Sequence, residues 1–133
     1  IKHFVPSVKG GKVLALGCGD GYEIKVLKRR KHEVIGLTFE EKEIGEDMVF
    51  GDIHEIPFEN SSFDGLYSKE VLEHSPAPYI ALCEINRVLK IGGWFAIFIS
   101  IGRVKQKEWY HFSCFPPHPP TIFKFITTGC QSC

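Results

Sequence analysis

The chain has 133 residues, of which 44% are hydrophobic and 24% charged, and this is typical of one soluble globular domain. Its 16 basic and 16 acidic residues give a formal net charge of zero, without the basic excess that binding to nucleic acids or anionic membranes requires. No apolar run approaches the roughly 18 residues of a membrane span. We therefore expect neither a nucleic acid nor a membrane as a partner.

The cysteines are odd in number and scattered, at positions 18, 83, 114, 130 and 133. Small secreted domains usually carry an even number of cysteines that form a disulfide framework. We therefore expect a reducing compartment and a cytoplasmic protein.

Short apolar runs alternate with amphipathic stretches along the chain as far as Ser100. This pattern predicts strands at Lys12–Leu16, Glu33–Thr38, Met48–Phe50, Phe63–Tyr67 and Trp94–Ser100, and helices at Tyr22–Lys31 and Pro78–Lys90. The basic run at 28–31 suits a helix C-terminus, and we interpret it as a solvated face rather than an RNA site.

The second predicted helix has the clearest signals. Pro78 suits a first turn, Glu84 and Arg87 are spaced to pair, and Gly92–Gly93 is expected to end the helix. The side chains expected on its buried face are Leu82, Ile85 and Leu89.

Strands that alternate with helices predict an α/β domain with a doubly wound, mainly parallel sheet. The composition changes after residue 101, where four of the eight prolines stand at positions 116, 117, 119 and 120. We assign residues 1–101 to the α/β core. Residues 102–133 form a Pro/Phe-rich segment that either belongs to the same domain or continues into a longer one, with a candidate strand at Phe123–Thr127.

A glycine-rich loop, Gly17–Gly21, follows the first strand and opens the first helix. Glycines there permit tight turns and the close approach of a ligand, at the sheet edge where α/β proteins bind ligands. Tyr22 stands where a dinucleotide fingerprint has its last glycine, which argues against NAD or FAD. The loop also lacks the Lys-Ser/Thr of a phosphate-binding P-loop.

Several ordered motifs resemble those of class I S-adenosylmethionine (SAM) dependent methyltransferases, and in particular the branch that acts on small molecules. They span roughly residues 12–100. The matching stretches are Val13–Gly21, Gly51–Phe58, Ser62–Asp64, Glu73–His74, Glu84–Lys90 and Gly92–Gly93. The resemblance implies a Rossmann-like methyltransferase fold, and because members are generally longer, we expect part of the terminal strands and helices to be missing from this chain.

The resemblance also implies a cofactor site for SAM, which would leave as S-adenosylhomocysteine. Asp52 resembles the residue that accepts a hydrogen bond from the adenine amino group, with Ile53 packing on the ring. A carboxylate suits that amine, because it is a strong acceptor. The implied cofactor-binding residues are Gly17, Cys18, Gly19, Gly21, Thr38, Phe39, Glu43, Asp52, Ile53, Tyr67 and Ser68.

Two positions depart from the family pattern. Ala15 stands where the family usually has Asp or Glu, and Thr38 stands where it often has the acidic residue that binds the ribose hydroxyls. Each missing carboxylate removes a charge-assisted hydrogen bond of about 1.5–3 kcal/mol. A branch that includes cyclopropane-forming enzymes also carries Thr there and uses a polar residue five positions on, which is Glu43 here. Glu40 is a second possible substitute, and a solvated helix start is the alternative for both.

Catalytic residues are less clear from the sequence. Methyl transfer needs a general base only where the acceptor must lose a proton. His74 and His111 are the candidates near the expected cleft, the alternatives being a structural histidine and an aromatic core around Trp109–Phe112. We name no partner for His54.

The tail holds enough nitrogen and sulfur ligands for zinc, in His111-x-x-Cys114, His118 and Cys130-x-x-Cys133. The spacing matches no common zinc finger, and we predict no metal site. We predict SAM-dependent methyl transfer to a small-molecule acceptor, with a homodimer as a possible assembly. The alternatives are an inactive, methyltransferase-like binding module and a truncated fragment of an enzyme.

Overall fold

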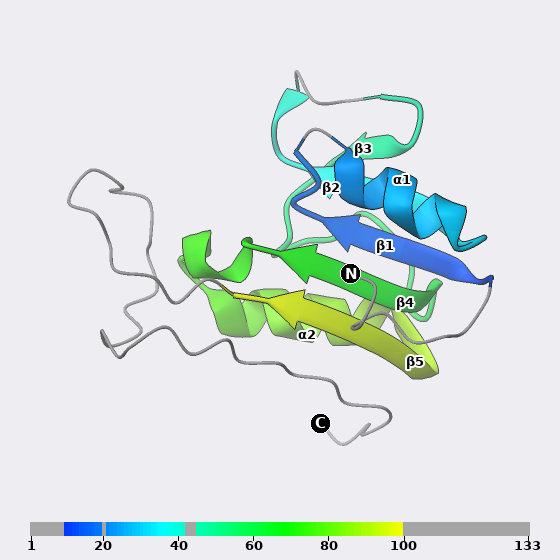
Figure 1. Ribbon diagram of the computed structural model, residues 1–133. Helices are drawn as coiled ribbons and strands as arrows, with labels where there is room; N and C mark the ends of the chain where they lie inside the picture. Colours follow the sequence, from blue (N-terminus) through cyan, green and yellow to red (C-terminus); the bar gives the residue numbers. More distant parts are fainter. Residues whose placement is uncertain (1–9, 20, 42–44, 100–133) are drawn as a thin grey trace, which may run out of the picture.

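The computed structural model describes residues 10–19, 21–41 and 45–99. Five strands form one sheet in the order β3-β2-β1-β4-β5, and every neighbouring pair is parallel (Figure 1). The strands are β1 (Lys12–Leu16), β2 (Glu33–Thr38), β3 (Met48–Phe50), β4 (Phe63–Lys69) and β5 (Leu89–Phe98). The predicted α/β fold with a parallel, Rossmann-like sheet is confirmed.

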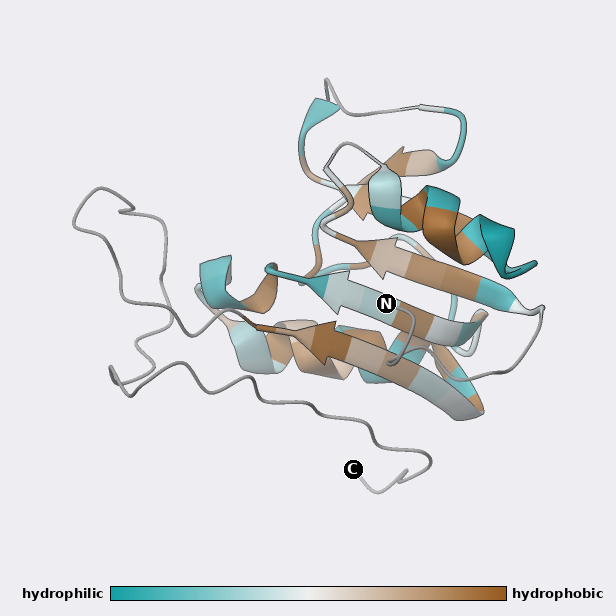
Figure 2. Ribbon diagram, viewed as in Figure 1, coloured by the Kyte–Doolittle hydropathy of each residue, from teal (hydrophilic) through white to brown (hydrophobic). Residues whose placement is uncertain are grey.

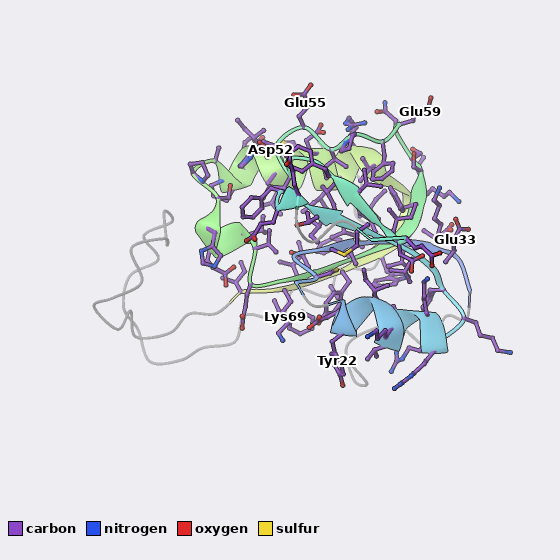
Figure 3. The ribbon with its side chains drawn as sticks, turned by 90° about the horizontal axis from the view of Figure 1, so that it is seen from above. Tyr22, Glu33, Asp52, Glu55, Glu59 and Lys69 are labelled. Atoms are coloured by element: carbon purple, nitrogen blue, oxygen red, sulfur yellow. The ribbon has the colours of Figure 1, made fainter. Side chains whose placement is uncertain are left out.

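The two helices cover opposite faces of this sheet. Seen from above, α1 (Tyr22–Arg29) and α2 (Pro78–Val88) lie on either side of the strands (Figure 3). Because successive strand residues point to opposite faces, Val13 and Ala15 pack with α1 while Leu14 and Leu16 pack with α2. Covering both faces explains why β1 is apolar almost throughout.

Each helix contributes a narrow apolar stripe to the core. In α1 the buried residues are Ile24 and Leu27, and the polar C-terminal turn of this helix is visible in Figure 2. In α2 they are Ala81, Ile85 and Val88. The prediction that Leu82 lines the buried face is wrong, because Leu82 lies one position away from this i, i+4, i+7 stripe and is 43% exposed.

The predicted bounds of β1, β2 and β3 are confirmed, whereas α1 ends at Arg29 instead of Lys31. Lys31 has a φ of 65°, its N–H donates to the Lys28 carbonyl, and the N–H of His32 donates to the Leu27 carbonyl. This is a Schellman end, with lysine in the left-handed conformation that glycine usually adopts.

The predicted junction between α2 and β5 is also wrong. The helix stops at Val88 and the strand begins at once with Leu89, which pairs with Phe63 of β4. The N–H of Ser62 donates to the Val88 carbonyl, so the neighbouring loop completes the helix end. Gly92–Gly93 lies inside β5, next to a register shift against β4, instead of ending the helix.

Residues 39–41 and 45–47 hold no α-helix between β2 and β3, in line with the short sequence gap there. The boundary at 101/102, the candidate strand Phe123–Thr127 and the tail's possible zinc ligands lie outside the described residues. No helix in the described ranges is long and apolar enough to cross a membrane.

Candidate functional site

The sheet brings the carboxyl ends of its five parallel strands to one edge. The strand order reverses beside β1, because the chain runs outward to β2 and β3 and then returns to place β4 on the other side. Ligands bind at such a switch point in open α/β sheets. The glycine loop leaves β1 and the segment from Ser68 to Glu70 closes β4 at this point.

The glycine loop has a conformation that requires glycine. Gly17, Gly19 and Gly21 have φ values of 66°, 38° and 74°, and the N–H of Gly21 donates to the Cys18 carbonyl at 2.6 Å. A Cβ on Gly17 would lie 2.1 Å from Cγ2 of Val71, so this glycine also allows the loop to pack against the segment after β4.

The other two glycines face open space. A Cβ on Gly19 or Gly21 would meet no heavy atom of the described residues within 4 Å. Gly21 immediately precedes α1, whose first N–H groups have no partner within the helix. The loop is therefore accessible to a polar ligand along its backbone, while the Cys18 side chain is buried beneath it.

The turn after β3 presents a carboxylate at the same edge. The Asp52 side chain is 66% exposed and lies on the α2 side of the sheet, whereas Tyr22 lies on the α1 side (Figure 3). Oδ1 of Asp52 accepts the backbone N–H of His54 at 2.8 Å and lies 2.6 Å from Nδ1 of the same residue. The backbone N–H of His54, helped by its imidazole and opposed by partial burial, holds the pKa of Asp52 below its usual value. Asp52 is therefore an anion at neutral pH.

The end of β4 combines burial with backbone strain. Burial, with smaller contributions from the charges of Glu23, Cys18 and Glu70, raises the pKa of Tyr67 to about 12. Ser68 is fully buried, and its hydroxyl has no partner among the described residues. Glu70 has a φ of 54°, a conformation that non-glycine residues seldom adopt outside functional sites and tight turns.

The remaining predicted site residues differ in burial, and two of them lie outside the described part of the chain. Thr38 is buried and its hydroxyl accepts the N–H of Glu40 at 3.1 Å, while the Phe39 ring is 76% exposed. Ile53 is half-buried, and His74 is exposed in the short 3-10 turn Leu72–His74 after β4. Glu43 and His111 lie outside the described residues. None of the roles predicted for these residues is tested by their placement.

The part that His54 and Ser75 play in this region was not predicted from the sequence. Nε2 of His54 lies 2.6 Å from Oγ of Ser75, which follows the 3-10 turn. The Asp-x-His spacing was a usable signal for the first contact, since Asp side chains often bond the backbone two residues on. The contact with Ser75 spans 21 residues and has no local sequence signal.

The chain is similar in sequence to known methyltransferases. A family described as a methyltransferase domain matches residues 14–97, which is more than half of the chain. A sterol 24-C-methyltransferase of Gibberella zeae is 31% identical over 113 residues, covering 74% of this chain and 30% of the relative. A demethylmenaquinone methyltransferase of Staphylococcus aureus is 37% identical over 99 residues, covering 64% of this chain and 41% of the relative.

A solved SAM-dependent methyltransferase from Mesorhizobium loti has the same fold, with a TM-score of 0.66 at 22% identity over 74% of this chain and 51% of that one. The chain therefore belongs to the class I SAM-dependent methyltransferase family. It spans between 30% and 41% of the length of the two curated relatives described above.

The residues at the switch point fit the cofactor that this family uses. SAM carries an amino-acid portion, a ribose and an adenine, all of which need polar partners. Such partners are supplied by the open backbone at Gly19 and Gly21, by the exposed carboxylate of Asp52 and by the buried Ser68 hydroxyl, which has no partner within the described part of the chain. Ala15 supplies none, because its side chain is a methyl group, which is fully buried between β2 and β4.

Proposed function

We propose that this protein binds SAM at the carboxyl edge of its sheet and transfers the methyl group to a small organic acceptor. The observation that carries the proposal is the glycine loop at the switch point, open above Gly19 and Gly21, with the anionic Asp52 in the turn after β3 at the same edge of the sheet. The relatives named for sterol and demethylmenaquinone methylation support a small-molecule acceptor. When bound, SAM supplies an electrophilic methyl group and leaves as S-adenosylhomocysteine.

The residues of this chain would bind and orient the cofactor. The loop backbone at Gly17, Gly19 and Gly21 would hold its amino-acid and ribose portions, and Asp52 would accept a hydrogen bond from the adenine amino group. Ile53 would pack against the adenine ring. The neutral Tyr67 phenol and the Ser68 hydroxyl, at the end of β4, would lie beside the methionine portion.

The two departures from the family pattern weaken this site without removing it. The chain has no carboxylate at Ala15, and the Thr38 hydroxyl is already used by the N–H of Glu40. Glu43 and Glu40 remain the candidates for the ribose. An inactive, methyltransferase-like module is the alternative that these departures favour.

Calorimetric titration with S-adenosylhomocysteine tests the cofactor site. We expect a dissociation constant in the micromolar range for the wild type, and a loss of about tenfold to a hundredfold in Asp52→Ala, which removes a hydrogen bond to a charged group. Glu55→Ala is the matched control, because it removes the same charge from an exposed position in the same turn and should leave affinity unchanged. A folded wild type that binds no S-adenosylhomocysteine would overturn the proposal.

Turnover separates the enzyme from the binding module. SAM with a labelled methyl group would be incubated with the protein and with a sterol or demethylmenaquinone, the two acceptors that its relatives are named for. Label in the acceptor supports the enzyme, and cofactor binding without any transfer supports the module. Should an active acceptor be found, His74→Ala tests the candidate base through kcat.

A further inference from the structure

A chain of hydrogen bonds runs from the turn after β3 to the segment after β4. Nδ1 of His54 lies 2.6 Å from Oδ1 of Asp52, and Nε2 of the same ring lies 2.6 Å from Oγ of Ser75. The His54 side chain is 24% exposed, and Ser75 is 2% exposed. The imidazole therefore joins an exposed carboxylate to a buried hydroxyl.

The direction of each bond follows from the chemistry of its partners. An ionised carboxylate only accepts, so Nδ1 carries the proton and donates to Asp52. Oγ of Ser75 accepts the backbone N–H of Ala77 at 3.1 Å, which leaves the hydroxyl proton free to be donated to Nε2. The imidazole is thereby held at both nitrogens in a single orientation.

Asp52, His54 and Ser75 are linked in the same order as the residues of a hydrolytic triad, but this network cannot catalyse hydrolysis. Ser75 is almost fully buried and its oxygen is fixed by Ala77, so no substrate reaches the hydroxyl. The exposed end of the arrangement is the carboxylate of Asp52. What the network can do is hold that carboxylate in place.

We propose that His54 is a positioning residue of the cofactor site: it fixes Oδ1 of Asp52 and leaves Oδ2 to accept the adenine amino group, while Ser75 anchors its ring. This inference rests on the proposed function and adds a specificity-determining residue to it. Without the imidazole, only the backbone N–H of His54 would hold Oδ1, so the exposed carboxylate would sample more orientations and binding would have to restrict them. A carboxylate held in advance binds its donor without that cost.

Two substitutions of His54 distinguish the contact made by Nδ1 from the contact made by Nε2. His54→Asn places an amide nitrogen where Nδ1 stands and keeps the donor to Asp52, and His54→Gln places one where Nε2 stands and keeps only the link to Ser75. His54→Ala removes both. The matched pair therefore tests whether the contact with Asp52 or the contact with Ser75 matters for the ligand.

The readout is the ratio of two affinities, measured by calorimetry for each variant. S-adenosylhomocysteine carries the adenine amino group, and S-inosylhomocysteine carries a carbonyl oxygen there that a carboxylate repels. We expect the wild type to prefer the former, and the preference to fall about tenfold in His54→Ala and His54→Gln but to stay within about threefold in His54→Asn. A merely structural role would lower both affinities together and leave the ratio unchanged.

The outcomes are distinguishable from failure of the proposed function. A wild type that binds neither ligand overturns both proposals. A wild type that prefers S-adenosylhomocysteine, with the same preference in His54→Ala and His54→Gln, overturns the role of His54 alone. An unchanged preference in Asp52→Ala would overturn the adenine contact and, with it, this inference.

Discussion

Glu84 and Arg87 stand one turn apart on α2 and are joined by two N–H···O bonds, from Nε to Oε1 and from Nη2 to Oε2, each 2.7 Å long. Arg87 also donates to the carbonyl oxygens of Ile56 and Phe58, both at 2.8 Å, and Glu84 accepts the N–H of Ile56 at 2.8 Å. The pair therefore fastens the loop that follows Asp52 to α2.

Replacing Arg87 should destabilise the protein strongly. In Arg87→Met, the Phe58 carbonyl loses the guanidinium donor, and the Ile56 carbonyl and the Glu84 carboxylate each keep only a backbone N–H. We expect the free energy of unfolding to fall by about 2–3 kcal/mol. Urea denaturation measures this loss. Lys28→Met is the matched control, because Lys28 pairs with Asp47 on the surface and exposed pairs contribute about 1 kcal/mol or less. Equal losses of unfolding free energy in the two variants would contradict the role of the Glu84–Arg87 pair in holding the loop to α2.

Stability should also depend on pH through Glu84. The Arg87 guanidinium and, to a smaller extent, the N–H of Ile56 hold the pKa of Glu84 below its usual value, against partial burial. A carboxyl group whose pKa is lowered by folding stabilises the protein above its unfolded pKa and ceases to do so as the pH falls through its folded pKa. The unfolding free energy should fall as the pH drops below about 5 toward the lowered pKa of Glu84, and it should fall less steeply in Glu84→Gln. A variant with the wild-type slope would rule this out.

The strands could be predicted from the sequence because their signals are local. β1 and β2 are apolar runs bounded by glycines or polar residues, and their predicted bounds are confirmed. The end of α1 could not be predicted, because Lys31 adopts the left-handed conformation for which glycine is the usual sequence signal. The start of β5 could not be predicted either, because Leu89 leaves the helix to pair with Phe63, a long-range contact.

The candidate site also has one part that could be predicted from the sequence and one part that could not. The glycine loop and Asp52 stand in short motifs that follow strands, so their place at the carboxyl edge follows from a parallel sheet. The network of His54 and Ser75 depends on how the turn after β3 packs against the segment after β4. A contact across 21 residues leaves no periodicity or motif in the chain.

Two glycines of the loop should respond differently to substitution by alanine. Gly17→Ala places a Cβ 2.1 Å from Val71 and 3.2 Å from the Lys69 carbonyl at a φ of 66°, and we expect a loss of about 3 kcal/mol or more. Gly19→Ala meets no atom within 4 Å, so only the left-handed backbone costs stability, by about 1 kcal/mol. Urea denaturation distinguishes these losses.

The same pair bears on the cofactor. If SAM lies over the loop, the Cβ of Gly19→Ala would occupy the space of the ligand, and the affinity for S-adenosylhomocysteine should fall although the fold persists. A Gly17→Ala variant as stable as Gly19→Ala would contradict the packing of the loop on Val71. Unchanged affinity in Gly19→Ala would place the ligand elsewhere.

The pairing of β4 with β5 depends on a glycine beneath an aromatic ring. Gly65 pairs with Trp94, and a Cβ on Gly65 would lie 2.2 Å from Cε2 of the indole. Trp94 is buried, with 7% of its surface exposed. Gly65→Ala should therefore lower the unfolding free energy by about 2–3 kcal/mol, since the ring cannot move without disturbing the core.

A double-mutant cycle tests whether the ring causes this loss. In Trp94→Leu, the smaller side chain leaves room, and Gly65→Ala should then cost less than about 1 kcal/mol, because alanine in a strand also restricts the unfolded chain. The interaction energy measured by urea denaturation of the four proteins should thus reach about 1–2 kcal/mol. Additive losses would mean that backbone conformation, and not the indole, requires glycine at position 65.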